Sequence, residues 1–158
     1  MSKHKNFKVG NGIDVHPLIK GRPLILGGVN IQHDYGCDGH SDGDVLIHSI
    51  IDSILGALGK GDLGDHFPSS NLQWKDANSL KLLNQIYYDH FKEDEWDIVN
   101  MDSTIILQSP IIKPYIEEMK NNISQLGITI NRDDISIKAT TTDHLGFIGE
   151  GKGIAVIT

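Results

Sequence analysis

The sequence predicts an α+β domain in which helices cover one side of a β-sheet. Segments with the apolar spacing of strands and of helices interleave along the whole chain, which is typical of mixed folds. The 158 residues, 39% of them hydrophobic, suffice for one domain with a buried core. Because the chain has no repeat, low-complexity tract or linker, we expect residues 1–158 to form a single domain. The sheet face left uncovered needs a partner, which predicts an oligomer.

The charge balance narrows the range of partners. The formal net charge is −7 at pH 7, whereas a nucleic acid or an anionic membrane is bound by a basic surface, so we expect neither as a partner.

No apolar run has the length of a membrane span and no signal sequence follows Met1, which favours a cytoplasmic protein of bacterial type. A plastid or apicoplast location stays open if a targeting peptide has been removed. The single cysteine, Cys37, cannot form an internal disulfide and leaves a reactive thiol as an alternative.

The first 31 residues predict β-structure. Residues 7–9 alternate briefly and then meet Gly10-Asn11-Gly12, which indicates a strand followed by a tight turn. Residues 23–26 and 29–31 flank Gly27-Gly28, and such a pair of glycines is typical of a hairpin turn.

An Asp-x-His pair lies on the extended segment after the first turn. Side chains alternate along a strand, so Asp14 and His16 point to the same side and can converge on one cation. The same pattern also fits a half-buried histidine with a hydrogen-bonded partner. At this point both interpretations stay open.

The central helix is predicted to begin near Ser41 and to run to about Leu58. Ser41 followed by Asp44, just before an apolar run, is typical of a capping box. Apolar residues then recur at helical spacing on one face and predict core contacts. They are Ile47, Ile50, Ile51, Ile54 and Leu58.

A polar stripe follows the flank of this helix. Asp44, His48 and Asp52 are four residues apart and close enough to serve one site. Gly39, Ser41 and Gly43 precede the helix, whose N-terminus would offer free N–H groups to an anion. A solvated flank without function is the alternative.

Three roles are open for Asp62, which follows the central helix. It either coordinates a metal, accepts a hydrogen bond from a hydroxyl or caps a turn.

The rest of the chain alternates between helix and strand patterns. Helices are predicted at residues 80–91 and 116–126, the second ending at Gly127. Strands are predicted at residues 96–107, 128–130, 135–139 and 154–157, with a glycine-rich loop at 146–153.

Several separated motifs together resemble the 2-C-methyl-D-erythritol 2,4-cyclodiphosphate synthase family. They are GNGIDVH at 10–16, HSDGDV at 40–45, His48, DLGDHFP at 62–68 and KATTTDHLGF at 138–147. Their order and their span of almost the whole chain make the resemblance specific. It implies a ferredoxin-like-related fold and a homotrimer whose sheets face the three-fold axis, with active sites between subunits.

The resemblance also implies a reaction and its metals. The expected enzyme is a phosphorus–oxygen lyase of the mevalonate-independent isoprenoid pathway, in which the 2-phosphate of 4-diphosphocytidyl-2-C-methyl-D-erythritol 2-phosphate attacks the β-phosphorus and CMP leaves. Asp14, His16 and His48 match the family's zinc ligands, and these three leave a tetrahedral Zn²⁺ one open position. Asp143 stands where the family has a glutamate that binds Mg²⁺ or Mn²⁺. His40 and Thr141 match its pair that stabilises the transition state.

Substrate contacts are carried over in the same way. Asp52 matches a helix acid for which a supporting role beside the zinc ligands is expected. The expected substrate-binding residues are Asp14, Val15, His16, His40, Ser41, Asp62, Leu63, Gly64, Phe67, Ser109, Pro110, Ile111, Ile112, Lys113, Thr140, Thr141, Thr142, Asp143, Phe147 and Glu150. Ile111 replaces a frequent lysine, Glu150 an arginine, and Ser69, Ser70 and Asn71 the usual acidic residues. These departures concern the affinity for the diphosphocytidyl end.

Two other functions compete with this one. A zinc-dependent phosphohydrolase would use the same three ligands to activate water. A zinc-stabilised binding or regulatory module would use them only to hold the fold, although a structural zinc is normally closed by four protein ligands.

Overall fold

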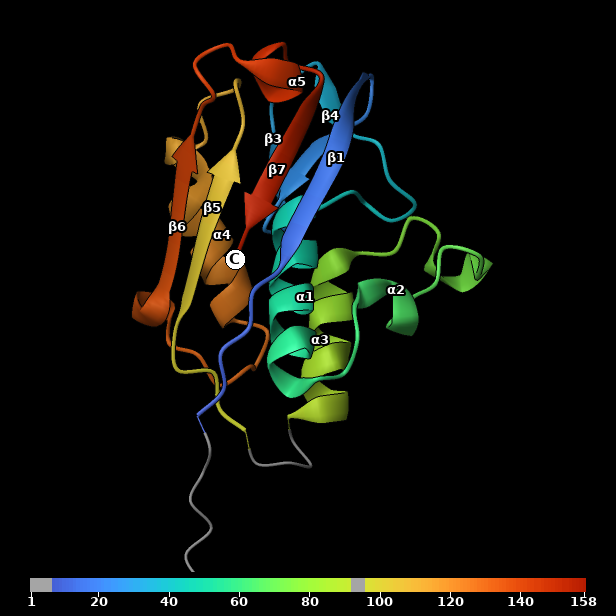
Figure 1. Ribbon diagram of the computed structural model, residues 1–158, viewed down its shortest axis with the longest axis vertical. Helices are drawn as coiled ribbons and strands as arrows, with labels where there is room; N and C mark the ends of the chain where they lie inside the picture. The colour runs from blue at the N-terminus through green and yellow to red at the C-terminus, as the bar shows by residue number, and fades with distance from the viewer. Residues whose placement is uncertain (1–6, 92–95) are drawn as a thin grey trace, which may run out of the picture.

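The computed structural model describes residues 7–91 and 96–158 as a mixed five-stranded sheet with helices packed on one face. The strands are β1 (Ile13–Lys20), β2 (Leu24–Leu26), β3 (Val29–Ile31), β4 (Tyr35–Cys37), β5 (Met101–Ile106), β6 (Ile135–Thr140) and β7 (Gly153–Ile157). The α-helices are α1 (Val45–Leu58), α2 (Leu63–His66), α3 (Ser79–His90), α4 (Ile116–Ser124) and α5 (Gly146–Gly149). Figure 1 shows β6, β5, β7 and β1 side by side, with α1 next to α3. This arrangement confirms the predicted α+β class.

The sheet has the strand order β4-β1-β7-β5-β6. β5 and β6 run parallel, while the other neighbours are antiparallel, so β1, β5 and β6 all point the same way. A second, two-stranded sheet is the hairpin of β2 and β3, as predicted. Gly27 and Gly28 form its turn with φ angles of 57° and 72°, which only glycine adopts without strain.

One face of the sheet carries the core and the other carries exposed apolar residues. Ile105 of β5 and Val156 of β7 are fully buried beneath the helices. On the opposite face Ile13 and Val15 of β1 are 57% and 49% exposed, and Ile157 of β7 is 42% exposed. A cluster of this kind on a sheet face favours coverage by another molecule.

The core of the domain is built around α1. Its buried residues include the predicted Ile47, Ile50, Ile51 and Ile54, which pack against β1, β7 and α3. The helix ends at Leu58, as predicted, because Gly59 adopts a left-handed conformation with φ 69°.

Within the described residues, none of the helices has the length and apolar character that a membrane span requires.

The predicted strand at residues 7–9 is wrong. The first strand starts only at Ile13, and the segment before it runs over the backbone of α1. A Cβ on Gly10 would lie 1.9 Å from the Ser53 carbonyl oxygen, and one on Gly12 would lie 2.0 Å from that of Ser49. These glycines therefore permit close contact between the chain and the helix, and they do not form a turn between strands.

Other boundaries also differ from the sequence patterns. Residues 128–130 are not a strand, although Ile128 and Ile130 are buried as part of the hydrophobic core. β5 is shorter than predicted and starts at Met101, and α4 ends at Ser124. The glycine-rich stretch, predicted as a loop, contains the short helix α5.

The predicted capping box of α1 is also wrong. Asp44 is itself the N-cap and accepts from the N–H of Ile47, while Ser41 lies outside the helix. A capping box is formed instead at α2, between Asp62 and Asp65. Asp62 thus caps a turn, which was one of the alternatives for this residue.

Candidate metal centre

Three side chains from two elements converge beneath the sheet. Asp14 and His16 point the same way from β1, as the alternation predicted, and His48 reaches them from the first turns of α1. The Asp14 Oδ2 atom lies 3.1 Å from Nε2 of His16 and 3.0 Å from Nδ1 of His48. One ligand atom from each residue lies within 4.8 Å of the other two. The structure therefore groups these residues as a set that can hold a metal ion.

The outer nitrogens of both histidines have protein partners. His16 Nδ1 lies 2.6 Å from the Asp38 carbonyl oxygen, which can only accept a hydrogen bond. His48 Nε2 lies 3.1 Å from Ser41 Oγ and 3.0 Å from Ser79 Oγ. When these outer nitrogens donate, the inner nitrogens are left with lone pairs.

This donor set fits a cation. Two imidazole lone pairs and a carboxylate oxygen all face one point, and three acceptors repel one another unless a positive charge lies between them. Imidazole and carboxylate ligands with hydrogen-bonded outer nitrogens are the usual surroundings of a protein-bound zinc. The position can be filled by a metal or, in its place, by protons on the imidazoles.

The electrostatics of the cluster agree with this fit. Burial alone would raise the pKa of Asp14, but hydrogen bonds and charge from His16 and His48 lower it far below its usual value. The hydrogen bond to Asp14 raises the pKa of His16, against the opposing effect of burial. Asp14 is therefore held as a carboxylate that attracts positive charge.

Asp44 does not serve this centre, contrary to the expected polar stripe. It is fully buried and accepts hydrogen bonds from Gly27 N, Gly28 N and Ile47 N. It therefore fastens the β2–β3 turn to the start of α1. Burial raises its pKa to about 6.

The predicted anion site at the start of α1 is not supported. The N–H groups there are already bonded within the protein: Asp42 N to the Ala77 carbonyl, Gly43 N to Ser41 Oγ and Asp44 N to Asp42 Oδ1. An anion at this point would have to displace these bonds.

Asp52 connects α1 to the loop before α2. Its Oδ1 accepts from Leu63 N at 2.8 Å, so it directly fixes the start of α2, where Asp62 is the N-cap and Leu63 and Gly64 form the first turn. Burial raises the pKa of Asp52. Phe67, at the end of α2, is buried and packs edge to face against Trp74.

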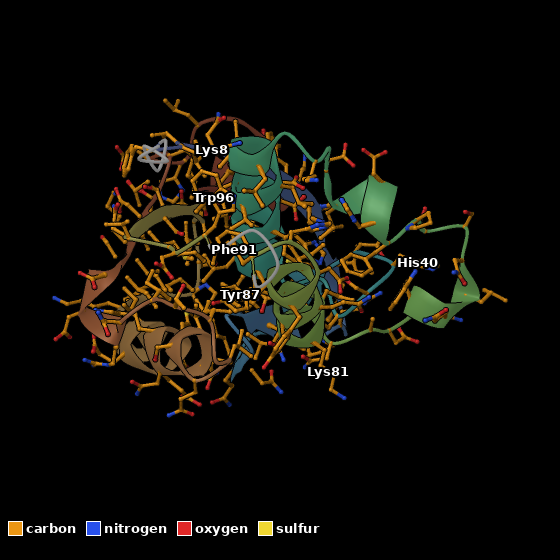
Figure 2. All side chains as sticks on the ribbon, turned by 90° about the horizontal axis from the view of Figure 1, so that it is seen from below. Lys8, His40, Lys81, Tyr87, Phe91 and Trp96 are labelled. Atoms are coloured by element: carbon orange, nitrogen blue, oxygen red, sulfur yellow. The ribbon has the colours of Figure 1, made fainter. Side chains whose placement is uncertain are left out.

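His40 lies on an exposed loop beside the cluster. Arg22 donates to the carbonyl oxygens on both sides of it, those of Gly39 and Ser41, each at 3.1 Å. Gly39 itself lies against His16, where an added Cβ would come within 2.9 Å of the ring. The His40 side chain faces a different side of the molecule from Lys8 and Trp96 (Figure 2).

A second group of predicted site residues lies after β5 and β6. Thr141 Oγ1 donates to Asp143 Oδ1 at 3.2 Å, and His144 N donates to Gln108 Oε1 at 3.2 Å. Asp143 and His144 both have positive φ angles, 50° and 65°. Such strained backbone is concentrated at functional sites.

The chain does not bring these two groups together. β1 and β6 are separated by β7 and β5, which amounts to three strand spacings, or about 14 Å. No hydrogen bond or ion pair links Thr141 or Asp143 to the metal cluster among the described residues.

The remaining predicted residues have varied surroundings. Val15 and Phe147 are about half exposed, whereas Ile112 is buried. Exposed residues of the expected substrate set also include Ser109, Ile111, Lys113, Thr140, Gly64 and Glu150, while Pro110 and Thr142 are half-buried. Glu150 pairs with Lys152 at 2.5 Å, and Ser109-Pro110 is a cis peptide.

Cys37 is buried, which raises its pKa to about 12 and argues against a reactive thiol.

The sequence patterns missed three residues around the site. Ser79 contacts His48 of the metal cluster, Asp42 contacts Ser79, and Arg22 contacts the His40 loop. Ser79 and Arg22 lie far from these partners along the chain. Only Asp42 had a signal, its place inside the HSDGDV motif. The other two contacts arise from tertiary folding.

Comparisons with known proteins agree on one family. The YgbB family model matches residues 7–158. The 2-C-methyl-D-erythritol 2,4-cyclodiphosphate synthase of Bacillus licheniformis is 48% identical over 149 residues, covering 94% of this chain and 93% of the relative. The protein of that name from Synechocystis sp. is 49% identical, with 94% and 91% covered.

Solved structures give the same result. Bifunctional IspDF from Campylobacter jejuni matches with a TM-score of 0.89 and 44% identity; the match covers 95% of this chain, which spans 40% of that longer protein. The CDP complex of IspF from Plasmodium falciparum matches with a TM-score of 0.77 and 37% identity, covering 95% of this chain and 91% of that one.

Proposed function

The chain belongs to the YgbB family of 2-C-methyl-D-erythritol 2,4-cyclodiphosphate synthases, lyases of isoprenoid synthesis, and on that premise we propose how it works. The substrate is 4-diphosphocytidyl-2-C-methyl-D-erythritol 2-phosphate. An oxygen of its 2-phosphate forms a bond to the β-phosphorus, and the bond from that phosphorus to the oxygen of the α-phosphate breaks. The products are 2-C-methyl-D-erythritol 2,4-cyclodiphosphate and CMP, and no water is consumed.

Catalysis of this step depends on positioning and on charge. Two negatively charged phosphates must be held in line, which water alone does not favour. Asp14, His16 and His48 would hold a zinc ion. Such an ion would supply positive charge to a phosphate of the substrate.

The other residues complete the site around the reacting phosphates. His40, on the loop fixed by Arg22, and Thr141 donate hydrogen bonds to the phosphate oxygens as charge shifts from the attacking to the leaving group. Asp143 would be the carboxylate ligand for Mg²⁺ or Mn²⁺, which would supply positive charge to the diphosphate. The start of α2, which Asp52 fixes, contacts the methylerythritol and its phosphate.

Each active site is shared between two subunits of a homotrimer. Within one chain Thr141 and Asp143 lie about three strand spacings from Asp14, too far for one small substrate to bridge with the β-phosphate in reach of both. The exposed apolar face with Ile13, Val15 and Ile157 gives the trimer a surface to bury. The cytidine end then enters the loop around Ser109 of the neighbouring subunit.

The observation that carries this proposal is the convergence of Asp14, His16 and His48 on one point, in a chain nearly half identical to enzymes of this name. The test is product analysis after incubation of the purified, zinc-loaded protein with the substrate. We expect CMP and the cyclic diphosphate in equal amounts, with no free phosphate. A His33→Ala variant, altered at a histidine outside the cluster, is the matched control and should give the same products.

A phosphohydrolase would give a different result. Water at the β-phosphorus would yield CMP and a linear bisphosphate that is heavier than the cyclic product by one water. Mass spectrometry separates the two, and a linear product as the major species would overturn the proposal.

A further inference from the structure

We propose that Asp42 and Ser79 are positioning residues that hold His48 in the orientation and tautomer that metal binding requires. The inference rests on the proposed function, since it concerns the same metal. Neither residue is among the expected ligands or substrate contacts. The two come from the loop before α1 and from the start of α3, helices that lie next to each other (Figure 1).

Ser79 lies between Asp42 and His48. Its side chain is fully buried, and its Oγ atom is 2.5 Å from Asp42 Oδ1 and 3.0 Å from His48 Nε2. A buried hydroxyl is costly unless both its proton and its lone pairs find partners. Asp42 and His48 together provide them.

The direction of the hydrogen bonds follows from Asp42. A carboxylate only accepts, and this one receives Ser79 N at 2.9 Å, Asp44 N at 3.2 Å and the Ser79 hydroxyl. The single hydroxyl proton of Ser79 is therefore directed to Asp42. Its lone pairs face His48, so Nε2 of His48 must be the donor.

The consequence lies on the other side of the imidazole ring. A neutral imidazole with its proton on Nε2 has its lone pair on Nδ1, the atom 3.0 Å from Asp14 Oδ2. The main-chain carbonyl of Asp38 has the same effect on His16. The Asp42–Ser79–His48 chain thus fixes which nitrogen is offered to a metal.

The Ser79 hydroxyl has no role in starting α3 that would explain its position. Asn78 is the N-cap of that helix and accepts from Lys81 N, and the Ser79 N–H is already bound by Asp42 Oδ2. Ser41 Oγ also contacts His48 Nε2, at 3.1 Å, but it accepts from Gly43 N, and no carboxylate among the described residues fixes the direction of its proton. Ser79 is therefore the residue that sets the polarity.

Two substitutions separate positioning from packing. Ser79→Ala removes one acceptor but leaves Ser41. Asp42→Asn lets the amide N–H₂ donate to Ser79 Oγ, so that the hydroxyl turns toward His48 Nε2 and the imidazole proton moves to Nδ1, facing Asp14. The matched control is Ser49→Ala, which deletes another fully buried, hydrogen-bonded hydroxyl one residue from His48 but outside the chain of bonds.

The readout is zinc affinity, measured by competition with a chelator, together with the visible spectrum of the Co²⁺-loaded protein. We expect affinity to fall about 10-fold in Ser79→Ala and about 100-fold in Asp42→Asn, with a shifted cobalt spectrum, while Ser49→Ala matches the wild type. Equal affinity and unchanged spectra in all three variants would overturn the inference and leave the cyclisation reaction untouched. A wild-type protein that binds no zinc would instead overturn the proposed metal itself, and with it this inference.

If the variants fail to fold, the zinc-loaded wild-type protein still tests the inference. Nitrogen-15 NMR of its histidines identifies the protonated nitrogen of His48. A proton on Nε2 is expected, and a proton on Nδ1 would contradict it.

Discussion

Asp14 Oδ2 lies 3.0 Å from His48 Nδ1, although the two residues are 34 positions apart, one on β1 and the other on α1. The contact exists because β1 packs directly against α1 and because Gly12, just before Asp14, lets the chain approach the helix backbone. One strand–helix contact thus creates the centre on which the proposed function depends.

The ligand role of His48 can be separated from its role in the fold. Replacing it with alanine should reduce bound zinc from about one per chain to almost none and abolish cyclisation, because two ligands hold the metal poorly. The fold should persist, since the core face of α1 is formed by Ile47, Ile51 and Ile54.

Zinc analysis and circular dichroism of the purified variant check both points. His33→Ala is the control and should keep its zinc. A His48→Ala protein that unfolds at ordinary temperature would indicate a structural metal.

Arg22 should position His40 without affecting the metal. Its guanidinium binds the carbonyls on both sides of His40, and an alanine or a lysine cannot reproduce this fork. We expect Arg22→Ala to lower kcat about 10-fold or more at unchanged zinc content. Arg132→Ala removes an arginine that pairs with Glu117 and Asp133, away from the His40 loop, and it should leave kcat unchanged. If the two variants behave alike, Arg22 does not position the loop.

Ionisation of the buried Asp44 side chain should make the stability of the folded protein depend on pH. Its folded-state pKa is raised by burial to about 6, above the unfolded value of 3.8. The folded state therefore binds more protons than the unfolded state between these values, and stability that is present at pH 4 is lost as the pH rises through 6.

An Asp44→Asn variant lacks this loss. The free energy of unfolding of the wild type minus that of the variant should therefore decrease by about 2 kcal/mol between pH 4 and pH 7. Urea titrations of both proteins in the presence of a chelator measure it. A difference that stays constant with pH would mean that Asp44 is ionised equally in both states.

The sequence was most informative where function and local pattern coincide. The alternation that places Asp14 and His16 together, and the spacing of Ile47, Ile51 and Ile54, were both confirmed because they depend on strand and helix geometry alone. Gly10 and Gly12 were misread as a turn, since the reason for them is the backbone of α1, more than 35 residues away. Ser79 and Arg22 were missed for the same reason: their partners are close only after folding.

Sharing of the active site can be tested by complementation. An Asp14→Asn chain lacks the metal face and a Ser109→Trp chain blocks the cytidine loop, so each should be inactive alone. In mixed trimers formed by co-expression, each face is intact with a probability of one half, and about a quarter of the sites should be whole. Mass spectrometry must confirm both chains in one particle. Activity no higher than that of the separate variants would place both faces in one subunit.

The most direct test is a crystal structure of the zinc-loaded protein with anomalous scattering measured at the zinc edge. The account predicts one zinc per chain, bound by a carboxylate oxygen of Asp14, Nε2 of His16 and Nδ1 of His48, with no fourth protein ligand. Zinc at another place, or a fourth protein ligand that closes the site, would contradict it.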